Sequence, residues 1–290
     1  MKLRRFFLLS ISLLFFSCAF FSCASSGKYI QPENDFHSEN YIPEIFEWKE
    51  EPQSKGTVSS FYFENKNFPV KYFIFKIDLY SPFIEIKIFP QELPEASFFK
   101  STRTKKTAEN ENLFLAINFT PFKKKNFISS KVKLAGLQKN NGKVFSKGQE
   151  KYCAFAFEKR NNNYAADFFE SQTSAEIENF SNALGGFFLI LKDGKKLPFK
   201  VASHDARIAL GLDKEKRFLF ILAVESSNKS MGLSFQECAE LLLHAGCTDA
   251  MQADGGSSSE AVLKGKSLLD SFYTRPQANT LGILVEENQN

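Results

Sequence analysis

The chain has 290 residues, of which 43% are hydrophobic, and this is enough apolar material to bury one core of ordinary size. Its 37 basic and 33 acidic residues give a formal net charge of +4. This near balance excludes the strongly basic composition of nucleic-acid-binding domains, so we expect no nucleic-acid partner.

Residues 1–22 are predicted to form a signal peptide of the lipoprotein type. A short basic start contains Lys2, Arg4 and Arg5, and an apolar run interrupted by serines follows it. That run is short for a bilayer-spanning helix, although an uncleaved N-terminal anchor is the alternative. Removal of the segment would leave a nearly neutral chain.

The end of this segment resembles a bacterial lipobox, in which a cysteine preceded by a small residue is diacylated and becomes the new N-terminus. Cys23 is the expected lipidation site, and Cys18 is the alternative. Lipid chains would hold the protein at a membrane surface without a spanning helix. We therefore expect an exported, membrane-anchored lipoprotein, either periplasmic or on the cell surface.

Residues 23–57 are polar and contain three prolines, which predicts a tether, and 58–288 are predicted to form one domain. Apolar runs rich in Phe, Ile, Tyr and Val recur there between turn-forming residues, a pattern typical of strands. The predicted strands are Tyr72–Ile77, Ile84–Phe89, Leu113–Asn118, Tyr152–Phe157, Phe187–Leu191, Ile208–Leu212, Phe218–Val224, Ala250–Ala253, Ala261–Leu263 and Thr280–Val285. The expected fold class is α+β, a single mixed domain with a multi-stranded β-sheet core and a few packed helices.

One helix is predicted to begin at Ser234. Ser234 and Glu237 have the spacing of a capping box, apolar residues follow at helical spacing, and Gly246 supplies a left-handed stop. A weaker helix is predicted over Ser174–Asn182. Three cysteines in the domain, Cys153, Cys238 and Cys247, lack metal-ligand spacing. Cys153 and Cys238 are expected to be small apolar side chains that face a core, and a disulfide bridge involving Cys247 is the alternative.

The strand Ala250–Ala253 leads into a turn, Asp254–Ser259, whose sequence is Asp-Gly-Gly-Ser-Ser-Ser. Two glycines after an acid allow positive φ angles and the close approach of a ligand, and successive N–H groups can form a concave anion site. An ordinary Asp-Gly turn capped by serines is the alternative.

This turn and the segments around it resemble the phosphodiester glycosidase family. The resemblance includes Met231–Ser234, the following helix, Gly246 and the Asp-Gly-Gly-Ser turn. Four further blocks occur in the family's order: Ala116–Asn118, Leu184–Gly186 with Lys192–Lys195, His204–Gly211, and Arg275 with Asn279. The chain departs from the family pattern at Phe119 and Thr120, where glycines are usual, and at Ile208, Gln252 and Ser257.

The resemblance implies hydrolysis of a sugar, of the N-acetylglucosamine type, that is joined through its anomeric carbon to a phosphodiester. Asp254 is the expected catalytic carboxylate, with Asp249 and Asp205 as weaker alternatives. Arg207 is expected to hold the phosphate, unless it forms an ion pair with Asp205 or Glu215. His204 is expected to donate to the phosphate or transfer a proton, unless it is an ordinary loop histidine.

The remaining expected site residues would bind the substrate: Asn118, Gly185, Gly186, Gly255, Gly256, Ser257, Ser258 and Arg275. For Arg275, ordering of the C-terminal strand is the alternative. No cofactor or protein metal site is expected, although a hard cation such as calcium could bind Asp and backbone oxygens. The expected partner is a glycan or glycolipid phosphodiester. The alternative function is a non-catalytic surface lipoprotein that binds a sugar phosphate on the same fold.

Overall fold

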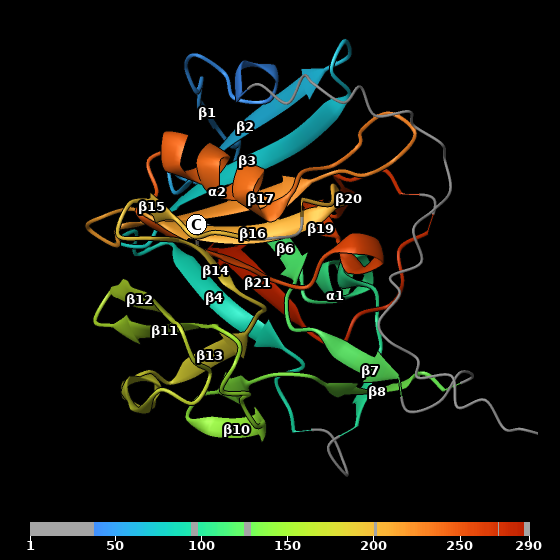
Figure 1. The fold of residues 1–290 in the computed structure, drawn as a ribbon. Helices are drawn as coiled ribbons and strands as arrows, with labels where there is room; N and C mark the ends of the chain where they lie inside the picture. Colours follow the sequence, from blue (N-terminus) through green and yellow to red (C-terminus); the bar gives the residue numbers. More distant parts are fainter. Residues whose placement is uncertain (1–37, 94–97, 125–128, 200–201, 272, 287–290) are drawn as a thin grey trace, which may run out of the picture. The chain divides into compact units, whose positions relative to one another are not determined.

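A computed structural model describes residues 38–93, 98–124, 129–199, 202–271 and 273–286. Within these ranges the chain is mostly β-structure with two α-helices (Figure 1). No helix in the described part of the chain combines the length and the hydrophobicity needed to cross a bilayer. The prediction of one mixed domain with a multi-stranded core is thus confirmed in its coarse form, with fewer helices than strands.

The largest sheet has eight strands in the order β1-β2-β3-β17-β16-β18-β14-β15, and we call it the first sheet. Every neighbouring pair in it is antiparallel. Its strands are β1 (Lys49–Glu50), β2 (Val58–Asn65), β3 (Val70–Asp78), β14 (Leu189–Lys192), β15 (Lys195–Lys196), β16 (Arg207–Leu212), β17 (Phe218–Val224) and β18 (Asp249–Gln252).

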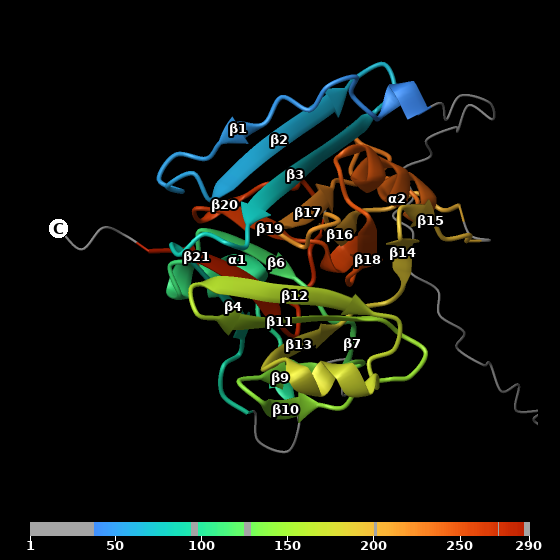
Figure 2. The same cartoon turned by 90° about the vertical axis from the view of Figure 1, so that its left-hand side faces the viewer.

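Three smaller antiparallel sheets complete the domain (Figure 2). The second sheet contains β20 (Lys266–Ser267), β19 (Ala261–Leu263), β6 (Leu115–Asn118), β21 (Thr280–Val285) and β4 (Ile84–Phe89) in that order. The third contains β10 (Lys143–Ser146), β9 (Gln138–Asn140), β13 (Asn182–Gly185), β11 (Ala154–Arg160) and β12 (Asn163–Phe169). The fourth contains β5 (Phe99–Lys100), β8 (Lys131–Leu134) and β7 (Phe122–Lys124).

The helices are α1 (Thr104–Asn110) and α2 (Phe235–His244). In the described part of the chain, 3-10 turns lie at Ser38–Asn40, Ala175–Asn179 and Gly256–Ser258. The predicted capping box at α2 is present: the Ser234 hydroxyl accepts from the Glu237 N–H at 3.3 Å, and the Ser234 N–H donates to the Glu237 carboxylate at 2.6 Å. This cap satisfies two N–H groups that the first turn of a helix would otherwise leave unpaired.

Side chains that alternate along the first sheet supply two separate cores. On one face, Ile74 and Leu222 pack with α2 residues such as Leu242. On the other face, Ile77 and Ile221 pack against the second and third sheets. This period-two pattern explains why continuous apolar runs such as Phe218–Val224 are buried on both sides.

Most predicted strands are confirmed, and Ile84–Phe89, Phe218–Val224, Ala261–Leu263 and Thr280–Val285 have the predicted bounds. The prediction of a helix over Ser174–Asn182 is wrong, because the structure has only a short 3-10 turn at Ala175–Asn179. Ile177 is the one buried residue of that turn, and Asn182 already pairs in β13. Cys153 and Cys238 are buried, as predicted, and Cys247 is buried and free, so the alternative of a bridge involving Cys247 is wrong.

Part of the segment expected to be a tether packs on the domain. Residues 38–57 contribute β1, and Tyr41 is 2% exposed. The Tyr41 hydroxyl donates to Glu240 of α2 at 3.0 Å, and its carbonyl accepts from the Tyr72 hydroxyl at 2.8 Å. The predicted signal peptide and both candidate lipidation cysteines lie outside the described residues, so these remain predictions.

Candidate functional site

The Asp254 turn, residues 254–260, carries the chain from β18 of the first sheet to β19 of the second. Main-chain hydrogen bonds hold it on both sides. The Asp254 N–H donates to the Phe119 carbonyl at 2.7 Å, and the Gly256 N–H donates to the Ala206 carbonyl at 2.8 Å. The turn therefore lies between the end of β6, which is Asn118, and the start of β16, which is Arg207. Both residues are among the site residues predicted from the sequence.

Asn118 spans the two ends of this turn. Its Nδ2 donates to the Asp254 carbonyl at 2.8 Å, and its Oδ1 accepts from the Glu260 N–H at 2.9 Å. The side chain is 1% exposed. Asn118 thus supports the turn that carries Asp254, and contact with a sugar remains a prediction.

Asp254 is buried and lies in a polar cluster with the buried Ser258 and the partly exposed Arg275. The Arg275 Nη2 is 3.3 Å from the Asp254 Oδ2, and the Arg275 Nε donates to the Ser258 hydroxyl. Burial raises the pKa of Asp254 above its ordinary value, while Arg275 and the Ser258 hydroxyl act in the opposite direction. A buried carboxylate beside a cation and a hydroxyl is an arrangement typical of functional sites.

Arg207 lies on the other side of the turn and is 9% exposed. Its Nε donates to the Leu233 carbonyl at 3.0 Å and its Nη2 donates to the Ser203 carbonyl at 2.8 Å. Among the described residues it forms no ion pair, so the alternative of a pair with Asp205 or Glu215 is wrong. Two fixed donors orient the guanidinium and leave Nη1 without a protein partner in the described part of the chain.

His204 is held at the N-terminus of α2. Its Nε2 is 2.9 Å from one Glu237 oxygen and 3.0 Å from the other. Glu237 is also the carboxylate of the capping box, so His204 and Ser234 share one acceptor. The structure places His204 next to the segment that carries Arg207, and any proton transfer by His204 remains a prediction.

The two glycines of the turn lie beside Arg207 and Asp205. A Cβ on Gly255 would lie 3.8 Å from the Arg207 Nη1, and a Cβ on Gly256 would lie 3.0 Å from Asp205. Gly256 has a φ of +59°, which favours glycine. Both glycines are half-buried and the Ser257 side chain is exposed. Solvent therefore reaches the turn at Gly255, Gly256 and Ser257.

Gly185 ends β13, Gly186 follows it, and both touch other parts of the protein. A Cβ on Gly185 would lie 2.4 Å from the Gln172 amide, and one on Gly186 would lie 2.5 Å from the Gln252 carbonyl. Gln172 donates to the Gly186 and Cys153 carbonyls, both at 3.1 Å. Close packing therefore explains why both positions are glycine. The Gly186 contact is with Gln252, two residues before Asp254. A role of either glycine in substrate binding remains a prediction.

Sequence reasoning missed the ion pair that closes the turn. Glu260 is 3% exposed and accepts from the Arg103 guanidinium at 2.6 Å and from the Thr104 N–H at 2.9 Å. The only signal was an acid directly before the apolar Ala261. Its partner is 157 residues away in the chain, so spacing could not reveal it.

The other two aspartates considered lie in different places. Asp249 begins β18, at the opposite end from the turn, where it accepts from Thr248 and from the Asp193 N–H. Asp205 borders Gly256 and accepts from the Ala206 N–H at 2.8 Å.

Phe119, which replaces a usual glycine, is fully buried and packs against Phe155 with ring centroids 6.2 Å apart. Its ring therefore points into the core and away from the surface of the turn.

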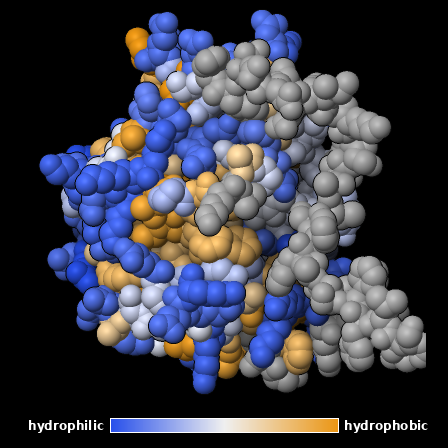
Figure 3. Space-filling view, in the orientation of Figure 1, coloured by the Kyte–Doolittle hydropathy of each residue, from blue (hydrophilic) through white to orange (hydrophobic). Residues whose placement is uncertain are grey.

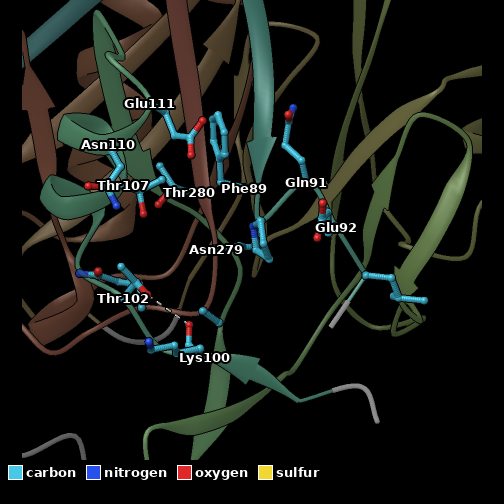
Figure 4. A pocket seen from close by; sticks show the side chains of 14 residues that line it. Phe89, Gln91, Glu92, Lys100, Thr102, Thr107, Asn110, Glu111, Asn279 and Thr280 are labelled. Atoms are coloured by element: carbon cyan, nitrogen blue, oxygen red, sulfur yellow. Dashed lines mark hydrogen bonds between the residues drawn. The ribbon is translucent and has the colours of Figure 1, made fainter. Parts of the chain in front are cut away.

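Two cavities flank this region without including Asp254 or Arg207. The larger, about 630 Å³, lies between the end of β4, α1 and the start of β21 (Figure 4). Asn279 and Gln277 line it, and Figure 4 shows Gln91 and Glu92 across from Thr107 and Asn110. The smaller, about 360 Å³, is lined mainly by apolar residues around Phe188.

The described residues contain no group of three or more His, Cys, Asp or Glu side chains placed to hold a metal ion. The expectation of no cofactor stays a prediction. The chemistry that these side chains can supply is hydrogen bonding and charge stabilisation around the Asp254 turn.

The Asp254 turn lies within a segment that matches a known protein family. The family model described as phosphodiester glycosidase matches residues 112–284, which include the turn, Arg207 and Arg275. No curated protein matches the chain.

Three solved structures have a similar fold. A hypothetical protein from Synechocystis superposes with a TM-score of 0.62 at 14% identity over 79% of this chain, which spans 62% of that one. A TM-score of 0.60 at 18% identity is found for the catalytic domain of zebrafish N-acetylglucosamine-1-phosphodiester alpha-N-acetylglucosaminidase, auto-inhibited by its pro-peptide. The match covers 79% of this chain and 83% of that one. A Burkholderia pseudomallei protein gives 0.53 at 11% identity over 74% of each chain. At these identities the structures establish the fold alone.

Proposed function

Because this chain belongs to the phosphodiester glycosidase family, we propose that it is an exported hydrolase that removes a sugar, of the N-acetylglucosamine type, from a sugar-1-phosphodiester. The observation that carries the proposal is that one glycine turn begins with Asp254 and has Arg207 beside its first glycine, Gly255. A carboxylate and a phosphate-binding cation are the two groups this reaction needs close together.

In this reaction the bond between the anomeric carbon and the phosphate oxygen breaks, and its electrons remain on the phosphomonoester. Water supplies the new hydroxyl of the free sugar. A phosphate leaving group departs readily, so cations that hold its charge matter more than a strong general acid. Arg207 offers Nη1 for that purpose, since its Nε and Nη2 are already bound to carbonyls.

Asp254 is proposed to face the anomeric carbon, where positive charge develops. Its carboxylate would stabilise that charge, attack the carbon or activate water. Arg275 and Ser258 hold the carboxylate from one side, and Asn118 fixes its main chain. The exposed Ser257 and the half-buried Gly255 and Gly256 would line the sugar.

A second candidate function is sugar-phosphate binding without turnover at the cell surface. The observation that favours it is the low exposure of Asp254, 5%, together with its ion pair to Arg275. A carboxylate held in this way must be uncovered before it can meet an anomeric carbon. The membrane anchor at Cys23 is proposed for both functions.

The deciding experiment measures release of N-acetylglucosamine by the purified full chain from methyl N-acetylglucosamine-1-phosphate. Turnover that Asp254→Asn abolishes supports the hydrolase. Binding of the compound by both proteins, with no sugar released by either from a broad panel, contradicts it and supports the binding function. Tyr62→Phe, a substitution at an exposed position on β2, is the control for differences between protein preparations and should leave turnover unchanged.

A further inference from the structure

A row of aromatic side chains leads away from Arg207. In order it contains Phe235, Phe199, Phe188, Phe187 and Tyr152, with neighbouring ring centroids 5.3, 5.9, 6.0 and 5.6 Å apart. We call these five residues the aromatic row. All five are partly exposed, and Phe188 is 39% exposed.

The row borders the cavity of about 360 Å³. Its walls include Leu189, Leu197 and Pro198 together with three members of the row, and Lys151 and Glu170 also line it. The face in Figure 3 carries a hydrophobic area, in the region where Figure 1 places β14, with hydrophilic residues around it. Isolated exposed apolar side chains are ordinary on proteins, whereas a connected group beside a cavity marks a binding surface.

One end of the row carries a fixed positive charge. The Arg207 guanidinium carbon lies 4.3 Å from the Phe235 ring centre, and its Nη1 faces the Gly255 position at 3.8 Å. Stacking on Phe235 and the two carbonyl contacts fix the guanidinium in this orientation. The groups thus follow the order Asp254, glycine turn, Arg207, aromatic row and apolar cavity.

We infer that the natural substrate is a glycosyl phospholipid, whose phosphodiester joins the sugar to a long hydrocarbon chain. The inference rests on the proposed function and names its substrate class. The sugar lies at the Asp254 turn, the phosphate binds Arg207, and the hydrocarbon chain lies along the aromatic row into the cavity. Charge complementarity at Arg207 and apolar contact beyond it select an amphiphile over a soluble sugar phosphate.

Turnover of matched substrates tests the inference. The full chain is assayed with N-acetylglucosamine-1-phosphate esterified to methanol, to octanol or to uridine. We expect kcat/KM for the octyl compound to exceed that for the methyl compound by at least about tenfold, since each buried methylene contributes roughly fourfold. Equal values for methyl and octyl, or a preference for the uridine compound, overturn the inference.

Two surface variants make the test specific. Phe188→Ser should reduce the octyl-to-methyl ratio of kcat/KM by roughly tenfold. Phe83→Ser removes a phenylalanine of nearly equal exposure, 40% against 39%, outside the row and should leave the ratio unchanged. An unchanged ratio in Phe188→Ser, with folding verified by circular dichroism, overturns the inference.

A binding measurement separates this inference from the proposed reaction. Calorimetric titration of the full chain should show octyl phosphate binding more tightly than methyl phosphate and octyl glucoside, by at least about tenfold each. Equal binding of octyl and methyl phosphate overturns the inference even if sugar phosphodiesters are hydrolysed. Tighter binding of octyl phosphate without turnover of any substrate supports hydrocarbon binding along the aromatic row and overturns the hydrolase alone.

Discussion

Asn118 and Asp254 are joined by a hydrogen bond from the Asn118 Nδ2 to the Asp254 carbonyl, 2.8 Å long. The other side-chain atom of Asn118 accepts from the Glu260 N–H. One buried amide therefore fixes the first and last residues of the turn that presents the carboxylate. The position of Asp254 relative to the second sheet depends on this residue, although the two are 136 residues apart.

Asn118→Asp should destabilise the fold by roughly 2–4 kcal/mol, because it replaces the donor to the Asp254 carbonyl with an acceptor in a buried place. Urea unfolding measures the loss. Asn163→Asp, at an exposed position at the start of β12, is the matched control and should change stability little. A raised KM with unchanged stability would instead assign Asn118 to sugar binding.

Several parts of the fold follow from local sequence. The capping box at Ser234 and Glu237 fixes the start of α2 within four residues, so its signal needs no tertiary partner. Alternation over Ile84–Phe89 and the two-sided apolar run Phe218–Val224 likewise predict their strands. Such signals are local, and the structure follows them closely.

Other parts depend on distant partners. The helix α1 has no side-chain cap of its own, and Glu260 supplies an acceptor for its first N–H from the far end of the Asp254 turn. Gly185 could be read as a ligand contact, whereas Gln172 fills the space beside it. No local pattern indicates either contact, which is why the turn was predicted and its support was not.

Asp254→Asn should lower kcat by roughly a thousandfold, because the amide cannot supply the negative charge or accept a proton. In the native enzyme the acid limb of kcat/KM should have its midpoint above 3.8, the ordinary aspartate value, since burial raises the pKa of Asp254. An acid limb that persists unchanged in the residual activity of Asp254→Asn would assign that limb to another group.

The same pKa shift predicts how stability depends on pH. A raised pKa in the folded state means that Asp254 favours folding at acid pH, below its unfolded pKa, and that this contribution is lost as pH rises through the folded pKa. Asp254→Asn removes this term. The stability of the variant relative to the native chain should therefore increase from pH 3.5 to pH 7, measured by urea unfolding. A decrease over that range would show that Arg275 and the Ser258 hydroxyl outweigh burial and lower the pKa of Asp254.

Arg207→Lys should weaken phosphate binding by roughly tenfold although the charge is kept, because an ammonium group cannot hold two carbonyls and a third partner in one plane. Titration with octyl phosphate measures the loss. Arg217→Lys is the control: Arg217 forms an exposed ion pair with Asp78 on the first sheet. Equal effects of the two changes would show that net charge, and not the guanidinium of Arg207, determines binding.

His204→Gln should reduce activity by less than about tenfold, because the structure uses His204 to contact Glu237 of the capping box and glutamine can replace that hydrogen bond. His204→Ala should lower the free energy of unfolding, measured in urea, by more than His204→Gln does. If His204 transfers a proton, both variants should instead lose at least roughly a hundredfold in kcat with similar stabilities.

Gln252 offers a test of how the buried site is maintained. It is fully buried at the end of β18, and neither its side-chain oxygen nor its nitrogen reaches a nitrogen or oxygen partner among the described residues, while the weakly polar Cys238 thiol lies beside it. A buried amide without partners is unfavourable, so Gln252→Met, with similar length and no polar amide, should raise the free energy of unfolding by about 1 kcal/mol. Ala250→Ser, which adds a buried hydroxyl on the same strand, should lower it. Destabilisation by Gln252→Met would mean that the amide has a stabilising partner in solution, and ordered water in the core beside Cys238 would then be sought by crystallography.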